Sequence, residues 1–318
     1  MQELFNIVLP VFGIIFAGYA SRRFGLLQDA SAEALNRFTY YIALPPLLFL
    51  STARVPLQSI LNWPFIIAYL TGSLIALFLA VLGARILFGH RDLSVLTLHG
   101  FAAVFANTVY MGIPLFLAAF GERGATPAVV GAVASNLFYI GLAVLLLEIF
   151  HHHKGGSALA IKAVGKALIR NPILVAPSLG IAASAAQIHL PLPIDRFLEL
   201  LSRTAGPCAL FALGLSLYGF PIHAGAKEIA WLTLIKLIIH PFATWVIAGP
   251  ILDLDPFWAA SAVLLAAMPS GAMVFVFAQK YGFYVQRSAT VVVVTTALSL
   301  VTLAVLFSWY GDVVTAIQ

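Results

Sequence analysis

Long apolar runs separated by short linkers constrain this chain more than any other feature of its sequence. Hydrophobic residues make up 62% of the 318 positions, whereas charged residues make up only 9%. A soluble domain carries charge on about a quarter of its residues. A helix needs about 20 apolar residues to cross a bilayer. The pattern therefore predicts an all-α integral membrane protein with about ten transmembrane helices.

The apolar runs divide into two groups of five around one long linker. The predicted spans cover residues 4–21, 36–53, 62–84, 94–120, 127–149, 172–188, 203–220, 229–250, 256–279 and 287–309. This gives a first five-helix repeat over 1–150, a linker over 151–171 and a second five-helix repeat over 172–318. In the linker, Lys162, Lys166 and Arg170 recur every fourth residue. That spacing predicts a short helix at the membrane surface.

Basic residues are distributed unevenly between the two sides of the predicted bundle. Of the 17 Lys and Arg, the linkers after the odd-numbered spans hold twelve and the other linkers hold four. Because cytoplasmic loops are enriched in Lys and Arg, the long linker is predicted to be cytoplasmic and both termini to lie outside. The same bias accounts for the net charge of +5. The sequence has no basic patch interleaved with aromatic residues, which is the pattern expected of a protein that binds nucleic acid.

The two halves share sequence features at matching places. The second span of each half reads "ALPPLLF" at 43–49 and "AGPCALF" at 205–211. The fourth spans contain Pro114 and Pro269, each two residues from a glycine. Because each half has five spans, the halves must run in opposite directions through the membrane. This predicts an inverted-topology repeat, which is an architecture of secondary transporters.

The two proline-containing spans are the predicted binding site. Proline lacks an N–H group, and hydrocarbon offers no water to satisfy the carbonyl that loses its partner. Paired Gly/Pro-interrupted spans point to the binding site of a transporter. Free N–H groups at a broken helix favour an anion, whereas unwound carbonyls favour a cation. The alternative is a plain proline kink, since proline is common in membrane helices.

Five sequence segments resemble the auxin efflux carrier family, in its prokaryotic branch that includes malonate-type transporters. They are "LPVFGIIFAGYASRRFGLL" at 9–27, "YYIALPPLLF" at 40–49, "NTVYMGIPLF" at 107–116, "KLIIHP" at 236–241 and "AAMPSGAMVFVFAQKYG" at 266–282. The resemblance covers essentially the whole chain. It implies ten helices with unwound, crossing helices 4 and 9. It also implies a scaffold of helices 1, 2, 6 and 7, a moving transport core of helices 3–5 and 8–10, and a homodimer.

The same resemblance implies an organic anion as substrate. Family substrates are auxin in plants and small carboxylates in bacteria. The chain lacks the long hydrophilic central loop of many plant members, which favours a carboxylate carrier in a bacterial inner membrane. The alternatives are an auxin-like aromatic carboxylate exporter, or a channel or sensor on the same scaffold.

The predicted substrate-binding residues lie on both interrupted spans and on the fifth span. Asn107 is costly inside a membrane unless it finds a partner, and the family motif places an asparagine here. Ser270 offers a hydroxyl to a carboxylate, although it could instead bond its own backbone. For Asn136 and Tyr139 on the fifth span, helix–helix contact is the alternative role. The full set is Asn107, Thr108, Tyr110, Met111, Gly112, Pro114, Asn136, Tyr139, Met268, Pro269, Ser270 and Gly271.

Span 8 carries a polar stripe of Thr233, Lys236, His240 and Thr244. Lys236 is the one Lys or Arg well inside a predicted span, and such a residue is a functional hypothesis by default. It could compensate the charge of the substrate or take part in proton coupling, with His240 beside it. The alternative is that its side chain snorkels to the cytoplasmic face.

Several classes of function have no support in the sequence. Catalytic motifs such as GxSxG and HExxH are absent, so no enzyme activity and no cofactor are predicted. No resident metal is predicted. No carboxylate cluster indicates a sodium site, so a coupling proton has more support than sodium. The prediction is a secondary carrier or facilitator for a small mono- or dicarboxylate such as malonate.

Overall fold

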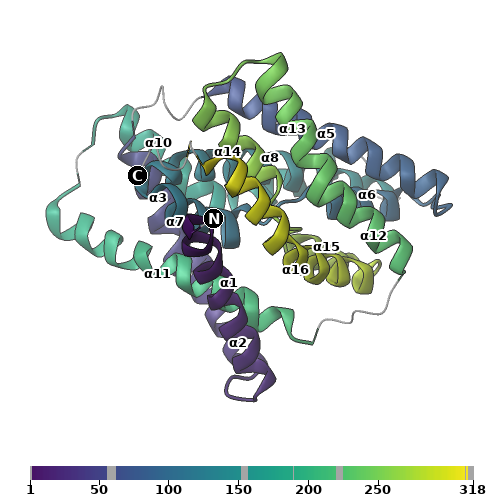
Figure 1. The fold of residues 1–318 in the computed structure, drawn as a ribbon, viewed down its shortest axis with the longest axis horizontal. Helices are drawn as coiled ribbons and strands as arrows, with labels where there is room; N and C mark the ends of the chain where they lie inside the picture. The colour runs from purple at the N-terminus through teal and green to yellow at the C-terminus, as the bar shows by residue number, and fades with distance from the viewer. Residues whose placement is uncertain are drawn as a thin grey trace.

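The computed structural model describes residues 2–55, 62–151, 157–188, 190–219, 225–311 and 313, and every regular element within them is helical (Figure 1). The predicted all-α fold class is therefore confirmed. Residues 152–156 of the predicted linker lie outside the described ranges.

Each predicted span overlaps a helical stretch, although α11 begins eleven residues before its predicted span and α2 begins seven residues before the second predicted span. The first half contains α1 (Gln2–Arg23), α2 (Asp29–Phe38), η1 (Thr39–Ala43), α3 (Leu44–Ala53), α5 (Trp63–Ile86), α6 (Leu93–Val104), η2 (Thr108–Gly112), α7 (Ile113–Phe120) and α8 (Glu122–His151). The second half contains α9 (Ser157–Ile169), α10 (Pro172–Ala185), α11 (Leu192–Leu217), α12 (Ala226–Leu234), η3 (Ile235–Ile239), α13 (His240–Val246), η4 (Ile247–Ile251), α14 (Pro256–Ala266), α15 (Met273–Tyr281) and α16 (Val285–Trp309). The η segments are single π-helical turns that continue a neighbouring α-helix.

Five of these helical stretches are long and apolar enough to cross a membrane. They are Trp63–Ile86, Glu122–Leu147, Leu192–Leu217, Ala226–Ile251 and Val285–Trp309. Four shorter apolar stretches accompany them, namely Leu93–Val104, Thr108–Phe120, Pro172–Ala185 and Pro256–Ala266. A multi-pass membrane protein follows from these lengths. The count of ten spans and the inverted repeat stay predictions.

Polar residues at the start of several helices explain where those helices begin. Asp92 accepts from the backbone N–H of Ser94 at the start of α6, and Asn171 accepts from Ile173 at the start of α10. Asp255 caps α14 in the same way. Each cap satisfies a backbone donor that the first helical turn leaves free.

Helices α1, α3, α10 and α11 form one closely packed group, in which α1 lies along α11 and α3 lies along α10. Glycines allow the first of these contacts. A Cβ atom built on Gly18 would meet the carbonyl of Phe211, and one built on Gly214 would meet the carbonyl of Ile15. Such small residues let backbones approach closely in a membrane.

We expect Gly214→Ala to destabilise this group. The added methyl group meets backbone, which cannot rotate away, so a loss of about 1–3 kcal/mol in the free energy of unfolding is expected. Gly13→Ala is the matched control, because a Cβ atom there meets nothing within 4 Å. Thermal unfolding of both variants checks this, and equal melting temperatures would contradict the close contact.

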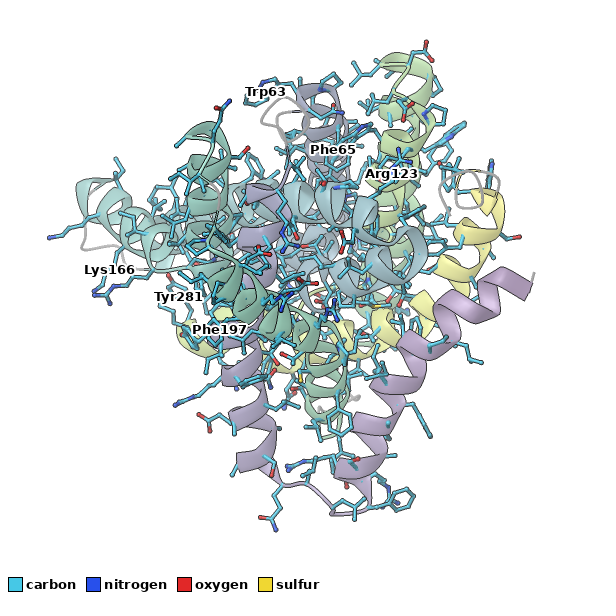
Figure 2. The ribbon with its side chains drawn as sticks, turned by 90° about the vertical axis from the view of Figure 1, so that its left-hand side faces the viewer. Trp63, Phe65, Arg123, Lys166, Phe197 and Tyr281 are labelled. Atoms are coloured by element: carbon cyan, nitrogen blue, oxygen red, sulfur yellow. The ribbon has the colours of Figure 1, made fainter. Side chains whose placement is uncertain are left out.

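The remaining long helices form a second group, in which α5, α6, α8, α12–α13, α14 and α16 contact one another. Figure 1 shows α5, α6 and α12 along one side of the molecule and α1, α2 and α11 along another. Helix α9, predicted as the linker helix, packs on α8 and α10. Its Lys166 is exposed and points away from the bundle in Figure 2.

Candidate functional site

Two interrupted helices meet in the interior of the protein. Helix α6 ends at Val104, and helical structure begins again with η2 at Thr108. Helix α14 ends at Ala266, and α15 begins at Met273. The two interruptions lie antiparallel to each other, with a β-bridge between Ala106 and Ser270. The N–H of Asn107 donates to the carbonyl of Pro269 (2.8 Å), and the N–H of Gly271 donates to the carbonyl of Phe105 (2.8 Å). Each interruption thus supplies hydrogen-bond partners to backbone groups of the other.

The first interruption lies about two turns earlier than the sequence predicted. Gly112 and Pro114 were expected to shape it, but the irregular residues are 105–107. Pro114 is the second residue of α7, a position that tolerates proline. The carbonyl of Asn107 accepts from the N–H groups of both Met111 (3.3 Å) and Gly112 (3.0 Å). That widened turn accommodates the proline. Asn107 itself is one of the irregular residues.

The Asn107 side chain carries an unsatisfied polar atom at this meeting point. It is buried, and its Nδ2 atom has no hydrogen-bond partner within the described ranges. Leaving a buried donor unpaired costs about 1–3 kcal/mol. A ligand carboxylate would be a natural acceptor for it. Of its predicted companions, Thr108, Met111 and Gly112 are also buried and Tyr110 is partly exposed.

Ser270 holds the second interruption in place. Its hydroxyl donates to the carbonyl of Ala102 on α6 (2.6 Å), and its N–H donates to Thr295 Oγ1 on α16 (3.0 Å). Gly271 is close to Phe105, because a Cβ atom there would lie 3.1 Å from that ring. Met268 and Pro269 are buried beside them. The Ser270 hydroxyl is therefore engaged by backbone in this structure.

Lys236 contacts the end of α14 from span 8. Its Nζ donates to the carbonyl of Ala266 (2.6 Å), which has no partner within its own helix because the helix stops there. The same Nζ lies 3.0 Å from His240 Nδ1. His240 Nε2 lies 2.8 Å from Ser73 Oγ, and Ser73 donates to the Tyr69 carbonyl. The network fits a His240 that carries its proton on Nε2 and accepts from Lys236. Lys236 is fully buried, so it does not snorkel.

The predicted pair on the fifth span lies in α8, beside this network. Asn136 donates from Nδ2 to the carbonyl of Ala132 one turn earlier (2.7 Å). Tyr139 packs against the rings of Phe101 and Phe105, at centroid distances of 5.8 and 6.0 Å. The Asn136 amide donor therefore serves its own helix, and the Tyr139 ring joins α8 to α6.

A cavity of about 390 Å³ lies beside the first interrupted span. Residues of α1, α3, α7, α8 and α11 line it, so it separates the α1–α3–α11 group from α7 and α8. Pro114 contributes to its wall, and Arg54, Arg203, Glu122 and Glu199 supply charges. The cavity therefore presents two guanidinium groups and two carboxylates to an entering anion.

Arg54 is held in this cavity by acidic neighbours. Its guanidinium donates to both carboxylate oxygens of Asp195 (2.8 Å each), and Glu199 lies 3.7 Å away. The hydrogen bond to Asp195 raises the pKa of Arg54 above its usual range. Sequence analysis missed this group, because Arg54 and Asp195 are 141 positions apart.

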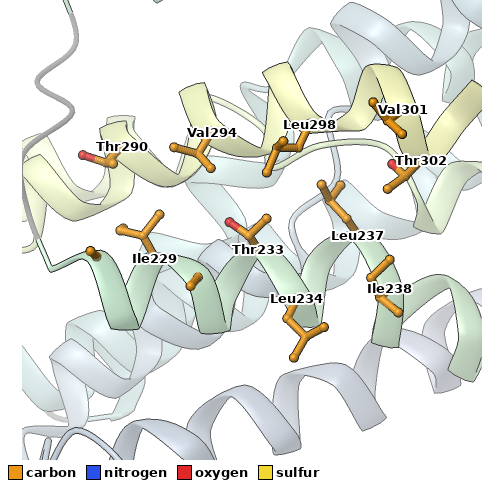
Figure 3. Close-up of a pocket in the computed structure, with 12 residues that line it drawn as sticks. Ile229, Thr233, Leu234, Leu237, Ile238, Thr290, Val294, Leu298, Val301 and Thr302 are labelled. Atoms are coloured by element: carbon orange, nitrogen blue, oxygen red, sulfur yellow. The ribbon is translucent and has the colours of Figure 1, made fainter.

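A larger cavity of about 770 Å³ lies elsewhere, between α12–η3 and α16 (Figure 3). Ile229, Leu237, Val294 and Leu298 are typical of its lining, which is largely apolar. Thr233 faces this cavity rather than joining Lys236 and His240. No charged side chain lines it, so it is poorly suited to a carboxylate.

A second polar cluster lies at one end of α6, α12 and α16. Glu228 Oε1 is 2.9 Å from His99 Nδ1, 3.1 Å from His90 Nε2 and 2.6 Å from the hydroxyl of Tyr284. Arg287 Nε is 3.1 Å from Glu228 Oε2. Sequence analysis missed this cluster too, because no local motif joins its members.

Comparison with known proteins decides the family. The profile of a family described as "Membrane transport protein" matches residues 4–307. The chain belongs to this family. Within it, a Rhizobium meliloti protein named "Putative malonate transporter" is 32% identical over 95% of this chain and 94% of its own length. An uncharacterized transporter of Methanocaldococcus jannaschii is 26% identical over 96% of this chain and 97% of its own length.

The resemblance to auxin efflux carriers is also confirmed. A rice protein named "Probable auxin efflux carrier component 5c" is 30% identical over 48% of this chain and 42% of its own length. Membership of the membrane transport protein family makes this chain a multi-pass transporter.

Proposed function

We propose that this chain is a secondary transporter or facilitator of small organic anions, and that it binds them where its two interrupted helices meet. The observation that carries the proposal is the reciprocal backbone bonding of residues 105–107 and 269–271 beside the unpaired Asn107 amide. Interrupted helices of this kind build binding sites in transporters. The name of the Rhizobium relative supports malonate or another small mono- or dicarboxylate as the substrate.

The proposed architecture is a ten-span inverted repeat in which helices 4 and 9 cross. The close group of α1, α3, α10 and α11 serves as the scaffold, and the helices of spans 3–5 and 8–10 form the transport core. The contacts within each group support this division. An elevator-like movement of the core along the scaffold would expose the site to each side of the membrane alternately.

Both termini are proposed to lie outside the cytoplasm of a bacterial cell, in its inner membrane. The distribution of basic residues supports this orientation. A homodimer formed through the scaffold is part of the same proposal. An exposed apolar face of α11, with Leu192, Phe197 and Leu200, supports a partner or lipid contact there.

Charge compensation is proposed to come from Lys236, with a proton as the coupling ion. Lys236 bonds directly to the carbonyl that ends α14, so a change in its hydrogen bonds would be felt at the second interruption. His240 and Ser73 extend this contact to α5. Sodium coupling has no support from a carboxylate cluster at the site.

Arg54 is proposed to attract the anion into the cavity. We expect Arg54→Gln to weaken substrate affinity about two- to fivefold at low ionic strength, the size typical of a partly exposed charge. The effect should shrink in salt, which screens exposed charges. Arg123→Gln is the control, since this exposed arginine does not line the cavity. Uptake measured against substrate concentration checks it, and equal affinities for both variants would contradict the role of Arg54.

Uptake of labelled malonate into liposomes containing the purified protein tests the proposed function. Saturable uptake, inhibited by other small carboxylates, is expected. Conduction that does not saturate would indicate a channel. Uptake of aromatic carboxylates alone would move the substrate to the auxin-like class, and binding without uptake would indicate a sensor.

A further inference from the structure

The cluster around Glu228 has the composition of a metal site. His90, His99 and Glu228 each offer one ligand atom, and these atoms lie within 4.8 Å of one another. Two imidazole nitrogens and one carboxylate oxygen form a ligand set that Zn²⁺ uses when it keeps an open fourth position. Imidazole ligands also favour a transition-metal ion over Mg²⁺ or Ca²⁺.

The spacing of these atoms suits one ion. The two distances from Glu228 Oε1, 2.9 Å to His99 and 3.1 Å to His90, are close to the separation of about 3.4 Å between ligands around a tetrahedral zinc. The ligands come from the loop after α5, from α6 and from α12. Small side-chain shifts would bring all three atoms, which now lie within 4.8 Å of one another, to tetrahedral separations around one ion.

The surroundings of Glu228 also fit. A ligating carboxylate is usually held by further hydrogen bonds. Here Arg287 holds Oε2 and the Tyr284 hydroxyl donates to Oε1, both from the start of α16. The His90 side chain is 19% exposed and Arg287 is 37% exposed, which gives an ion a route from solvent. His99 and Glu228 are almost fully buried.

We propose that His90, His99 and Glu228 bind a divalent transition-metal ion, with Zn²⁺ as the probe. The ion would join the loop after α5 to α6 and α12, through residues that lie outside both interruptions. The second ring nitrogen of His99 limits the affinity of the site for the ion. With metal on Nδ1, the proton of His99 moves to Nε2, which is buried and has no partner within the described ranges. Ligand histidines whose second nitrogen lacks an acceptor bind about 10–100-fold more weakly, so the site is exchangeable.

Thermal unfolding with added ZnCl₂ tests the site without using transport. The protein should carry no polyhistidine tag, and His151, His152, His153, His189 and His223 should be replaced by alanine to remove other zinc ligands. We expect Zn²⁺ to raise the melting temperature of this background by a few degrees, because binding to the folded state stabilises it. His99→Gln and Glu228→Gln should each abolish the shift.

Two further variants keep the test decisive. Tyr284→Phe loses the hydroxyl contacts to Glu228 Oε1 and His99 Nδ1 but no proposed ligand, so it should keep the zinc shift. His90→Gln changes the most exposed ligand and should reduce the shift while leaving the protein folded. Co²⁺ should give the visible absorption of a tetrahedral nitrogen–oxygen site only while all three ligands are present. No zinc shift in the background, or an equal shift in His99→Gln and Glu228→Gln, would overturn the proposal.

Discussion

Replacing Asn107 with alanine is expected to reduce transport strongly while leaving the protein folded. The Asn107 backbone bond to Pro269 does not depend on the side chain, and the buried Nδ2 has no partner among the described residues. Stability should therefore change little. If Nδ2 binds the substrate carboxylate, its loss removes a hydrogen bond to a charged group, worth about 1.5–3 kcal/mol. Affinity should then fall roughly 10- to 100-fold.

Substrate titration of uptake in proteoliposomes measures this effect. Asn36→Ala is the matched control, because Asn36 lies in α2 and donates to Ser216 of α11, away from both interruptions. It should transport with nearly unchanged affinity. Unchanged affinity in Asn107→Ala, with the same melting temperature, would remove the side chain from the proposed site.

Replacing Lys236 with methionine is expected to abolish transport and also to destabilise the protein. The change leaves two buried acceptors without a donor, namely the Ala266 carbonyl and His240 Nδ1. Each unsatisfied group costs about 1–3 kcal/mol. The predicted loss in the free energy of unfolding is therefore about 2–6 kcal/mol, which thermal and denaturant unfolding can detect.

A double variant separates stability from function. Removing both partners of a buried polar pair costs less than removing one, so Lys236→Met with His240→Leu should recover part of the lost stability. If Lys236 compensates the charge of the substrate, transport should stay absent even so. Transport that returns together with stability would show that Lys236 has a purely structural role.

Features that depend on local chemistry can be traced to the sequence. Asp92 and Asp255 stand directly before apolar runs, and each caps the helix that follows. The interruption at 267–272 is visible as proline and glycine within an apolar span. Lys236 was singled out because an ionisable residue in hydrocarbon has a high free-energy cost. Its hydrogen-bond partners are the carbonyl at the end of α14 and His240.

Features that depend on distant contacts were not predictable in the same way. The position of the first interruption was wrong by about two turns, because a π-helical turn accommodates Pro114 and the bridge to Ser270 decides which residues unwind. The bond from Ser270 to Ala102 joins positions 168 apart. Glu228 meets His99 across 129 positions, so no spacing rule for metal ligands detects it.

Substrate-dependent thermal stabilisation across a panel of carboxylates tests the central claim most directly. The purified wild-type protein and Asn107→Ala would be unfolded with malonate, other small mono- and dicarboxylates, and aromatic carboxylates. A ligand that binds the folded state raises the melting temperature. The account predicts that a small carboxylate stabilises the wild type and has little effect on Asn107→Ala. Stabilisation of both proteins to the same extent, or of neither by any carboxylate, would contradict it.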